Sequence, residues 1–256
     1  QLPEGAIGSE LAIISESEQR SSALVTGSDG HLYAWGENDE GRLGVGSTEE
    51  FVTTPTHVQL PNNITVKHVY SLDHSSFVTG SDGHLYAWGD NSLGELGVGR
   101  NDYFITTPTR TQLPNNITVR HVYSLDLSSF VAGSNGHLYA WGDNSDGELG
   151  VGSTEEIVTT PTRVEMPDDT TVTHVHKFGF GSALVTGSDG HLYAWGENKN
   201  GRLGVGSTEE IVTTPTRVQM PNNTTVTHVD RFNMYAEYAL VRGSDGHLYA
   251  WGNNDE

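Results

Sequence analysis

A short apolar and aromatic pattern recurs along the chain. The six residues HLYAWG return at intervals of 53 to 56 residues, and their tryptophans are Trp35, Trp88, Trp141, Trp195 and Trp251. In the second copy, strand alternation places Leu85 and Ala87 on one face and His84, Tyr86 and Trp88 on the other. Large apolar groups on both faces predict a strand that is covered on both sides.

Each repeat predicts four short strands. In the second copy they are residues 65–71, 76–79, 84–88 and 105–112. The string Gly-Ser-Asp-Gly at 80–83 predicts a tight hairpin turn, because Asp-Gly supplies the positive φ angles that such turns need. Glycines punctuate the loop at 89–99, and Pro108 marks the last strand as an edge strand or the site of a bulge.

Four short strands in a period of about 50 residues, with no helical periodicity, predict a β-propeller blade. We therefore expect an all-β fold, a β-propeller of about five four-stranded blades with one blade incomplete. Residues 1–256 form a single domain in this interpretation. Its units are approximately 1–61, 62–114, 115–167 and 168–221, with a partial unit at 222–256.

The string DGHLYAWGDNSLGELGVG, residues 82–99, resembles the regulator of chromosome condensation repeat family. The hallmark of that family is an apolar-aromatic strand followed by W-G-x-N-x-x-G-x-L-G-x-G, and five copies cover nearly the whole chain. The resemblance implies a β-propeller, usually with seven blades, that acts mostly as an interaction platform. The chain departs from the family in having at most five units. It also lacks the usual Gly-x-x-His-Ser stretch, which only residues 73–76 approach.

The last copy stops after WGNNDE, before the loop and fourth strand that follow the other four tryptophans. The first residues, Gln1-Leu2-Pro3, match Gln59-Leu60-Pro61, which follow a fourth strand. Three explanations remain open: a five-bladed ring with one short blade, which we favour, a piece of a longer propeller, or a strand from another subunit. An open sheet edge is a template for adding a strand, so we expect this edge to be covered locally or used for self-association.

Charge narrows the class of partner. Lys and Arg total 13 and Asp and Glu total 33, giving a net charge of −20. This balance argues against nucleic acid, which needs a basic surface, and against anionic lipid. No apolar run is long enough to cross a membrane. The chain has no cysteine, which excludes disulfides and thiolate chemistry and favours an extracellular or exported protein over the cytoplasmic alternative.

The pattern predicts no enzyme, cofactor or metal site. Every candidate carboxylate recurs in several copies, whereas an active site would normally break the repeat. Residues 41–46 are glycine-rich, but no Lys-Ser/Thr follows, so a phosphate loop is not expected. Nine repeated histidines could form rings that hold a metal or respond to pH, but we favour packing between blades. They are His31, His84, His137, His191 and His247, with His68, His121, His174 and His228.

The candidate partner-binding residues lie in loops and in breaks of the repeat. Acidic loops on one rim would attract a basic protein surface or calcium, against the plainer interpretation of a solvated surface. Extra aromatic residues fit a partner-binding patch or, equally, repairs beside the incomplete blade. The candidates are Glu49, Glu50, Glu155, Glu156, Glu209 and Glu210, with Tyr103, Phe104, Phe232 and Tyr235.

Binding and scaffolding through a protein partner is the first hypothesis. A carbohydrate-binding propeller, with pockets between blades lined by Trp and Tyr, is the second. A third is guanine nucleotide exchange, as in the namesake of the family, although no matching insertion is present. Four Asn residues, Asn63, Asn116, Asn222 and Asn223, match the N-glycosylation pattern, but a turn after a strand explains Pro-Asn-Asn equally well.

Overall fold

The computed structural model describes residues 8–17, 20–71, 74–114, 117–125, 127–177, 181–229 and 238–253. The chain divides into two compact units, residues 1–122 with 159–161, and residues 123–158 with 162–256. Within the described residues, no helix is long and apolar enough to cross a membrane.

The first two sheets each contain four antiparallel strands, in sequence order across the sheet. The first sheet is β1 (Gly8–Ser17), β2 (Arg20–Gly27), β3 (Leu32–Glu37) and β4 (Phe51–Val58). The second is β5 (Val66–Ser71), β6 (Ser75–Gly80), β7 (Leu85–Asp90) and β8 (Phe104–Arg110). The four strands expected for the second repeat are confirmed.

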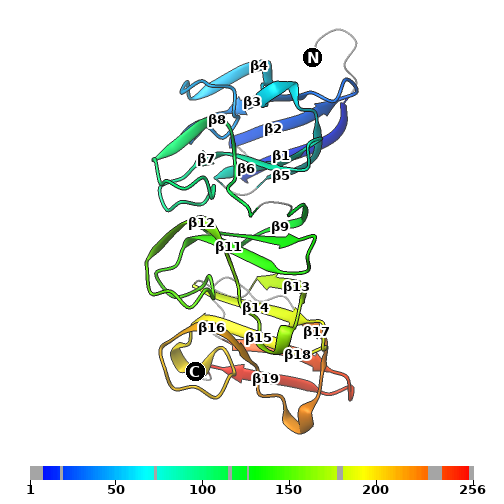
Figure 1. Cartoon of the computed structure of the whole chain (residues 1–256), viewed down its shortest axis with the longest axis vertical. Coiled ribbons are helices and arrows are strands. Elements are labelled where there is room, and N and C mark those ends of the chain that lie inside the picture. Colours follow the sequence, from blue (N-terminus) through cyan, green and yellow to red (C-terminus); the bar gives the residue numbers. More distant parts are fainter. Residues whose placement is uncertain are drawn as a thin grey trace. The chain divides into compact units, whose positions relative to one another are not determined.

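The third and fourth sheets repeat this order, and the fifth has three strands in the described part of the chain (Figure 1). The third sheet is β9 (Val119–Leu125), β10 (Ser128–Gly133), β11 (Leu138–Asp143) and β12 (Ile157–Arg163). The fourth is β13 (Val172–Lys177), β14 (Ser182–Gly187), β15 (Leu192–Glu197) and β16 (Ile211–Arg217). The fifth is β17 (Val226–Val229), β18 (Tyr238–Gly243) and β19 (Leu248–Gly252). The all-β propeller-blade fold with one incomplete blade is confirmed.

The hairpin turn differs from the expected type. In the turn after β6 only Gly83 has a positive φ, at 82°, and Asp82 does not. The Gly83 amide donates to the Gly80 carbonyl at 2.9 Å. The Asp82 carboxylate instead accepts hydrogen bonds from the His84 amide at 3.1 Å and the Tyr86 hydroxyl at 2.8 Å. The aspartate therefore holds the turn with its side chain and needs no left-handed backbone.

Proline and asparagine sit where the sequence predicts turns and edges. Pro108 lies in β8, the outermost strand of its sheet, beside a register shift between Ala87 and Gly89. Short 3-10 turns occur at η1 (Asp39–Gly41), η2 (Pro61–Asn63), η3 (Pro167–Asp169), η4 (Lys199–Gly201) and η5 (Pro221–Asn223). The Pro-Asn-Asn segments at η2 and η5 are turns, as expected, and Asn116 lies outside the described residues.

The core lies between successive sheets. In the first unit, Leu32 and Ala34 of β3 belong to one buried cluster with Val78, Tyr86 and Trp88 of the second sheet. In the second unit the same positions meet between the third and fourth sheets and between the fourth and fifth. In β7 both faces are buried, with Leu85 exposed by 1% and Trp88 by 0%, which confirms the strand covered on both sides.

Within the units, an indole hydrogen bond joins a tryptophan-bearing strand to the preceding Trp-Gly loop in three places. Trp88 Nε1 donates to the Arg42 carbonyl at 2.8 Å, Trp195 Nε1 to the Glu148 carbonyl at 2.7 Å, and Trp251 Nε1 to the Arg202 carbonyl at 2.9 Å. A glycine two residues after each carbonyl lets the loop approach the ring. A Cβ on Gly150, where φ is 68°, would lie 2.5 Å from Trp195 Nε1.

We predict that Gly150→Ala destabilises the protein more than Gly201→Ala. Both glycines have positive φ, 68° and 66°, but a Cβ on Gly201 meets no atom of the described residues within 4 Å. Gly201→Ala should cost about 1 kcal/mol for the left-handed backbone, and Gly150→Ala a further 1–3 kcal/mol, roughly, for the collision with the indole. Denaturant unfolding measures both. Equal losses would contradict the close approach of loop and ring.

Candidate functional site

Four loops join a tryptophan-bearing strand to the outer strand of the same sheet. We call them Trp loops 1 to 4: residues 38–50, 91–103, 144–156 and 198–210. Within each unit, a Trp loop bonds to the next sheet along the chain. In the first unit, the Gly46 amide of Trp loop 1 donates to the Thr106 carbonyl of β8 at 2.8 Å. In the second unit, Gly152 of Trp loop 3 donates to Thr213 of β16 at 2.9 Å. A backbone hydrogen bond therefore fixes Trp loops 1 and 3 to the sheet that follows each of them.

A buried asparagine organises each Trp loop. Asn144 Oδ1 accepts from the Leu149 amide at 3.2 Å, and its Nδ2 donates to the Ser153 and Glu155 carbonyls at 3.2 and 2.8 Å. The Asn144 amide also donates to the Glu156 carbonyl at 2.8 Å. The backbone of the acidic pair is thus tied to the interior while its side chains face solvent. The equivalent buried residues are Asn38, Asn91 and Asn198.

These asparagines are not among the functional residues predicted from the sequence. The sequence does contain a signal for them, since an Asn stands three residues after the Trp in all four repeats that have a Trp loop. A polar residue that recurs at a fixed place in an apolar motif is a candidate for hydrogen bonding inside a loop, because a buried amide needs partners for its donors and its acceptor.

The structure exposes the predicted acidic pairs. All six of these glutamates are exposed: Glu49, Glu50, Glu155, Glu156, Glu209 and Glu210. Tyr103 is 84% exposed and Phe104 43%. Phe232 and Tyr235 lie outside the described residues, so their role stays a prediction.

An apolar residue follows each acidic pair, at the first position of the outer strand. Phe51 is 53% exposed and Ile211 44%, and Phe104 holds the same position in β8. Exposed rings and aliphatic groups beside carboxylates form a mixed surface on the Trp loops. Phe104 is predicted from the sequence, but Phe51 and Ile211 are not, because these two lie inside the repeat and do not break it.

A surface hollow of about 330 Å³ lies on Trp loop 1, between the 3-10 turn η1 and the acidic pair. It brings together two predicted residues from different sheets, Glu50 of Trp loop 1 and Phe104 of β8. Asp39 and Glu40 also line it. Burial, followed by the charge of Asp90, raises the pKa of Glu40, and His74 opposes this shift from 3.6 Å.

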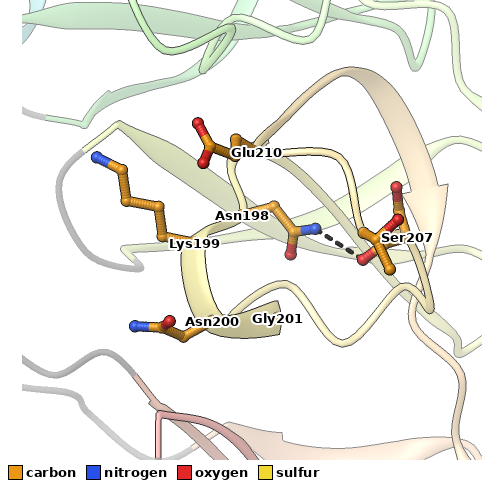
Figure 2. Close-up of a pocket in the computed structure, with 7 residues that line it drawn as sticks. Asn198, Lys199, Asn200, Gly201, Ser207 and Glu210 are labelled. Atoms are coloured by element: carbon orange, nitrogen blue, oxygen red, sulfur yellow. Dashed lines mark hydrogen bonds between the residues drawn. The ribbon is translucent and has the colours of Figure 1, made fainter.

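The equivalent hollow on Trp loop 4 measures about 510 Å³ and has a different charge. Its lining includes Lys199 and Asn200 where Trp loop 1 has Asp39 and Glu40. Figure 2 shows Asn198 at its centre, with its amide bonded to the Ser207 carbonyl at 3.0 Å and the Glu210 carboxylate to one side. Two loops with nearly the same sequence therefore present an acidic and a mixed hollow.

Some carboxylates of the predicted acidic loops are buried. Glu37 is 2% exposed, Glu95 5% and Glu148 6%, so these carboxylates do not contribute to an exposed acidic face. For Glu37, an arginine partner accompanies burial, and Glu197 at the equivalent position of the fourth sheet also has one. Glu37 lies 3.9 Å from Arg42, and Glu197 accepts from Arg202 at 2.7 Å.

Trp loops 2 and 3 carry glutamate where loops 1 and 4 carry this arginine. Glu148 Oε2 accepts from the Asp146 amide at 3.0 Å, and Glu95 Oε2 from the Leu93 amide at 2.9 Å. Burial, and to a lesser degree the nearby charges of Asp143 and Asp146, raise the pKa of Glu148 to about 7. A carboxyl group that is partly neutral near pH 7 therefore sits behind the acidic pair of Trp loop 3.

The structure brings no metal site together among the described residues, where no group of three or more His, Asp or Glu side chains could hold an ion. Histidines cluster in pairs on the strands instead. The rings of His174 and His176 lie 4.4 Å apart, and His176 bonds to the Thr186 hydroxyl at 2.8 Å. Burial, with the charges of His174 and His228, lowers the pKa of His176 to about 4.

The sugar pockets expected between blades are not formed by the tryptophans of the second, third and fourth sheets. Trp88, Trp141 and Trp195 are all 0% exposed. A sugar ring needs an accessible aromatic face on which to stack, and these faces are covered by protein. The tryptophan repeat therefore serves packing in these sheets.

We predict that Glu148→Gln stabilises the protein at pH 8 and not at pH 4.5. The folded state raises the pKa of this carboxyl from 4.5 to about 7, so its favourable contribution is complete below pH 4.5 and is lost as the pH rises through 7. The gain at pH 8 should be roughly 1–3 kcal/mol. Thermal unfolding at both pH values measures it, with the exposed Glu155→Gln as the matched control. A gain independent of pH would rule out titration as the cause.

The chain is similar to known proteins along its tryptophan-bearing repeats. The model of the regulator of chromosome condensation (RCC1) repeat matches residues 29–78, 82–124, 135–177 and 189–230. The chain is 30% identical over 239 residues to the ultraviolet-B receptor UVR8 of Arabidopsis thaliana, covering 91% of this chain and 51% of that protein. It is 28% identical over 262 residues to the E3 ubiquitin-protein ligase HERC2 of Homo sapiens, covering 100% of this chain and 5% of that protein.

Solved structures share the fold. Human WBSCR16 superposes with a TM-score of 0.68 at 22% identity, over 90% of this chain and 60% of that one. Yeast RCC1 (Prp20), bound to Kap60, superposes with a TM-score of 0.67 at 20% identity, over 97% of this chain and 57% of that one. The chain spans about half the length of UVR8. With its repeats matched at four positions, the chain belongs to the regulator of chromosome condensation repeat family.

Proposed function

We propose that the chain is a non-enzymatic binding scaffold that takes a protein partner with a basic surface on its Trp loops. The observation that carries the proposal is the exposed surface made of acidic pairs beside apolar residues. Glu49 and Glu50 precede Phe51, and Glu209 and Glu210 precede Ile211. All six are exposed.

The loops have the rigidity that recognition needs. The buried asparagines and the indole hydrogen bonds fix the loop backbone before a partner arrives, which reduces the entropy lost on binding. Tyr103 and Phe104 are aromatic anchors, and a few such residues carry most of the binding energy at protein interfaces. The carboxylates around them attract a positively charged surface and speed association.

Relatives support a protein partner. Yeast RCC1 (Prp20) was crystallised bound to Kap60, and Prp20p of Saccharomyces cerevisiae was studied for its binding to Gsp1p and histones. The net charge of −20 fits a basic partner of the histone kind. Guanine nucleotide exchange stays a prediction, because no feature of the Trp loops favours it over plain binding.

We predict that removing the exposed acidic pairs weakens binding to core histones, used as a basic probe. Replacing the six carboxylates by amides keeps shape and removes charge, so the association rate should fall by roughly tenfold at low salt. Biolayer interferometry with immobilised histones at two salt concentrations measures it. The variant combines Glu→Gln changes at Glu49, Glu50, Glu155, Glu156, Glu209 and Glu210.

The matched control removes charge elsewhere. Asp168→Asn with Asp169→Asn changes the charge by as much as Glu155→Gln with Glu156→Gln, and converts η3 to the Pro-Asn-Asn turn of the other repeats. Equal weakening by these two double variants would reduce the effect to net charge and reject the Trp-loop surface. Unchanged histone binding in the sixfold variant would reject the proposal as a whole, as would binding that survives Tyr103→Ala with Phe104→Ala undiminished.

A further inference from the structure

The hollow on Trp loop 1 lacks a cation that the equivalent hollow on Trp loop 4 contains. Both hollows are lined by the buried asparagine, the three residues of the 3-10 turn, and the threonine and second glutamate of the loop. Trp loop 4 places Lys199 in this lining, and Trp loop 1 has Asp39 at the same position. None of the residues that line the hollow on Trp loop 1 is basic.

Lys199 shows how an ammonium group is held beside this turn. Its Nζ lies 2.7 Å from Glu197 Oε1. A hydrogen bond and the charge of Glu197, followed by the charges of Asp146 and Glu210, raise the pKa of Lys199. Figure 2 shows Lys199 and Glu210 at the edge of the hollow. Carboxylates of the loop and of its surroundings therefore stabilise a positive charge at this place.

Trp loop 1 has the carboxylates without that ammonium. Asp39, Glu40 and Glu50 line its hollow. Burial and the charge of Asp90, with a smaller effect of Asp39, raise the pKa of Glu40. The nearest opposing group is the imidazole of His74, 3.6 Å from Glu40, which is charged only when protonated. The negative charges of this hollow therefore repel one another, and a permanent cation would relieve the repulsion.

The arginine of Trp loop 1 does not replace the missing ammonium. Arg42 is 4% exposed, and its Nη1 lies 3.9 Å from Oε2 of Glu37, which is 2% exposed. Its charge lowers the pKa of Glu40 less than Asp90 raises it. Arg42 therefore serves the interior of the loop. Trp loop 4 has an equivalent arginine inside, Arg202, and carries its surface lysine in addition.

Phe104 gives the hollow an apolar wall. It is 43% exposed, begins β8 and lines the hollow together with Glu50. Beside Trp loop 3 the same position holds Ile211, whose Cγ2 lies near Gly147. A lysine side chain packs its methylene stem on apolar surface and keeps its ammonium among polar groups, and an aromatic face attracts that ammonium. An acidic hollow of about 330 Å³ with an aromatic wall therefore matches a lysine side chain.

A metal ion matches the hollow less well. Among the described residues, no group of three or more His, Asp or Glu side chains is placed to hold an ion. The carboxylates around the hollow are thus too dispersed to converge on one small cation. An ammonium on a long flexible stem needs no such convergence, since it exchanges hydrogen bonds with one or two carboxylates at a time.

We propose that the hollow on Trp loop 1 binds the side chain of a lysine from the basic partner. The ammonium lies among the carboxylates of Asp39, Glu40 and Glu50, and the methylene stem packs on Phe104. This inference rests on the proposed function, because it names the group of the basic surface that the loop takes. Trp loop 4 does not take such a lysine, since Lys199 already supplies its ammonium.

The test uses Nα-acetyl-lysine N-methylamide as the probe and NMR titration of the full ¹⁵N-labelled chain. A ligand of this size should bind with a dissociation constant on the order of 1 mM. Saturable shifts are expected at the amides of Gly41 and Thr48, with no matching shift at Gly201 of Trp loop 4. The matched ligand, acetylated also at the ε-nitrogen, keeps the stem and loses the charge, so it should bind at least roughly tenfold more weakly.

Two double variants separate the hollow from net charge. Asp39→Asn with Glu40→Gln should weaken probe binding roughly tenfold, whereas Asp168→Asn with Asp169→Asn removes the same charge from η3 and should change it by less than about twofold. A third variant, Asp39→Lys with Glu40→Asn, gives Trp loop 1 the residues of Trp loop 4. It should fold normally, because Asn200 has the φ of 55° that Glu40 has at 57°, and its built-in ammonium should abolish saturable binding.

The aromatic wall is tested by Phe104→Leu, which keeps an apolar side chain and removes the ring. Probe binding should weaken roughly threefold. The proposal is overturned by a lack of saturable shifts, by equal binding of the uncharged ligand, or by shifts that persist in the Asp39→Lys, Glu40→Asn variant. Tighter binding of the corresponding arginine analogue would also overturn it. The probe is a single amino-acid analogue and no histone is present, so this proposal and the proposed function can fail separately.

Discussion

The indole hydrogen bond between successive sheets is the interaction on which the rest of each unit depends. It fixes a strand of one sheet to the Trp loop of the sheet before it, as between Trp195 and the Glu148 carbonyl at 2.7 Å. The bond exists only because Gly150 lets the loop reach the ring. A buried indole N–H without an acceptor would cost about 1–3 kcal/mol, so the aromatic packing and the loop geometry must form together.

The same bond also fixes the position of the Trp loop, which carries the proposed binding surface. Once the carbonyl before the glycine is fixed on the next sheet, the buried asparagine holds the remainder of the loop, and the acidic pair is left in solvent. Variation then falls on positions that neither the indole nor the asparagine uses. That is why Asp39 and Glu40 in one loop can become Lys199 and Asn200 in another without changing the backbone turn, which has φ near 55° at both Glu40 and Asn200.

Charge inside the loops follows a second pattern. An arginine of Trp loops 1 and 4 pairs with the glutamate just before the loop, whereas in loops 2 and 3 a glutamate accepts a hydrogen bond from a backbone amide. In the second arrangement, burial raises the pKa of Glu148 to about 7. Loops of one backbone design therefore differ in electrostatics and in response to pH, which suits a scaffold whose sheets can meet different parts of a partner.

Sequence alone determined the repeat, the four strands of each blade, the turns and the shortened fifth unit, because strand alternation, Asp-Gly turns and tryptophan spacing are local signals. It also placed Glu155 and Tyr103 on exposed loops. Only the tertiary structure decided that Glu95 and Glu148 are buried, that Glu50 and Phe104 share one hollow, and that Phe51 and Ile211 are exposed. Each of these depends on how one sheet lies on the loop of another. Neither residue type nor spacing encodes the distance between side chains that are tens of residues apart.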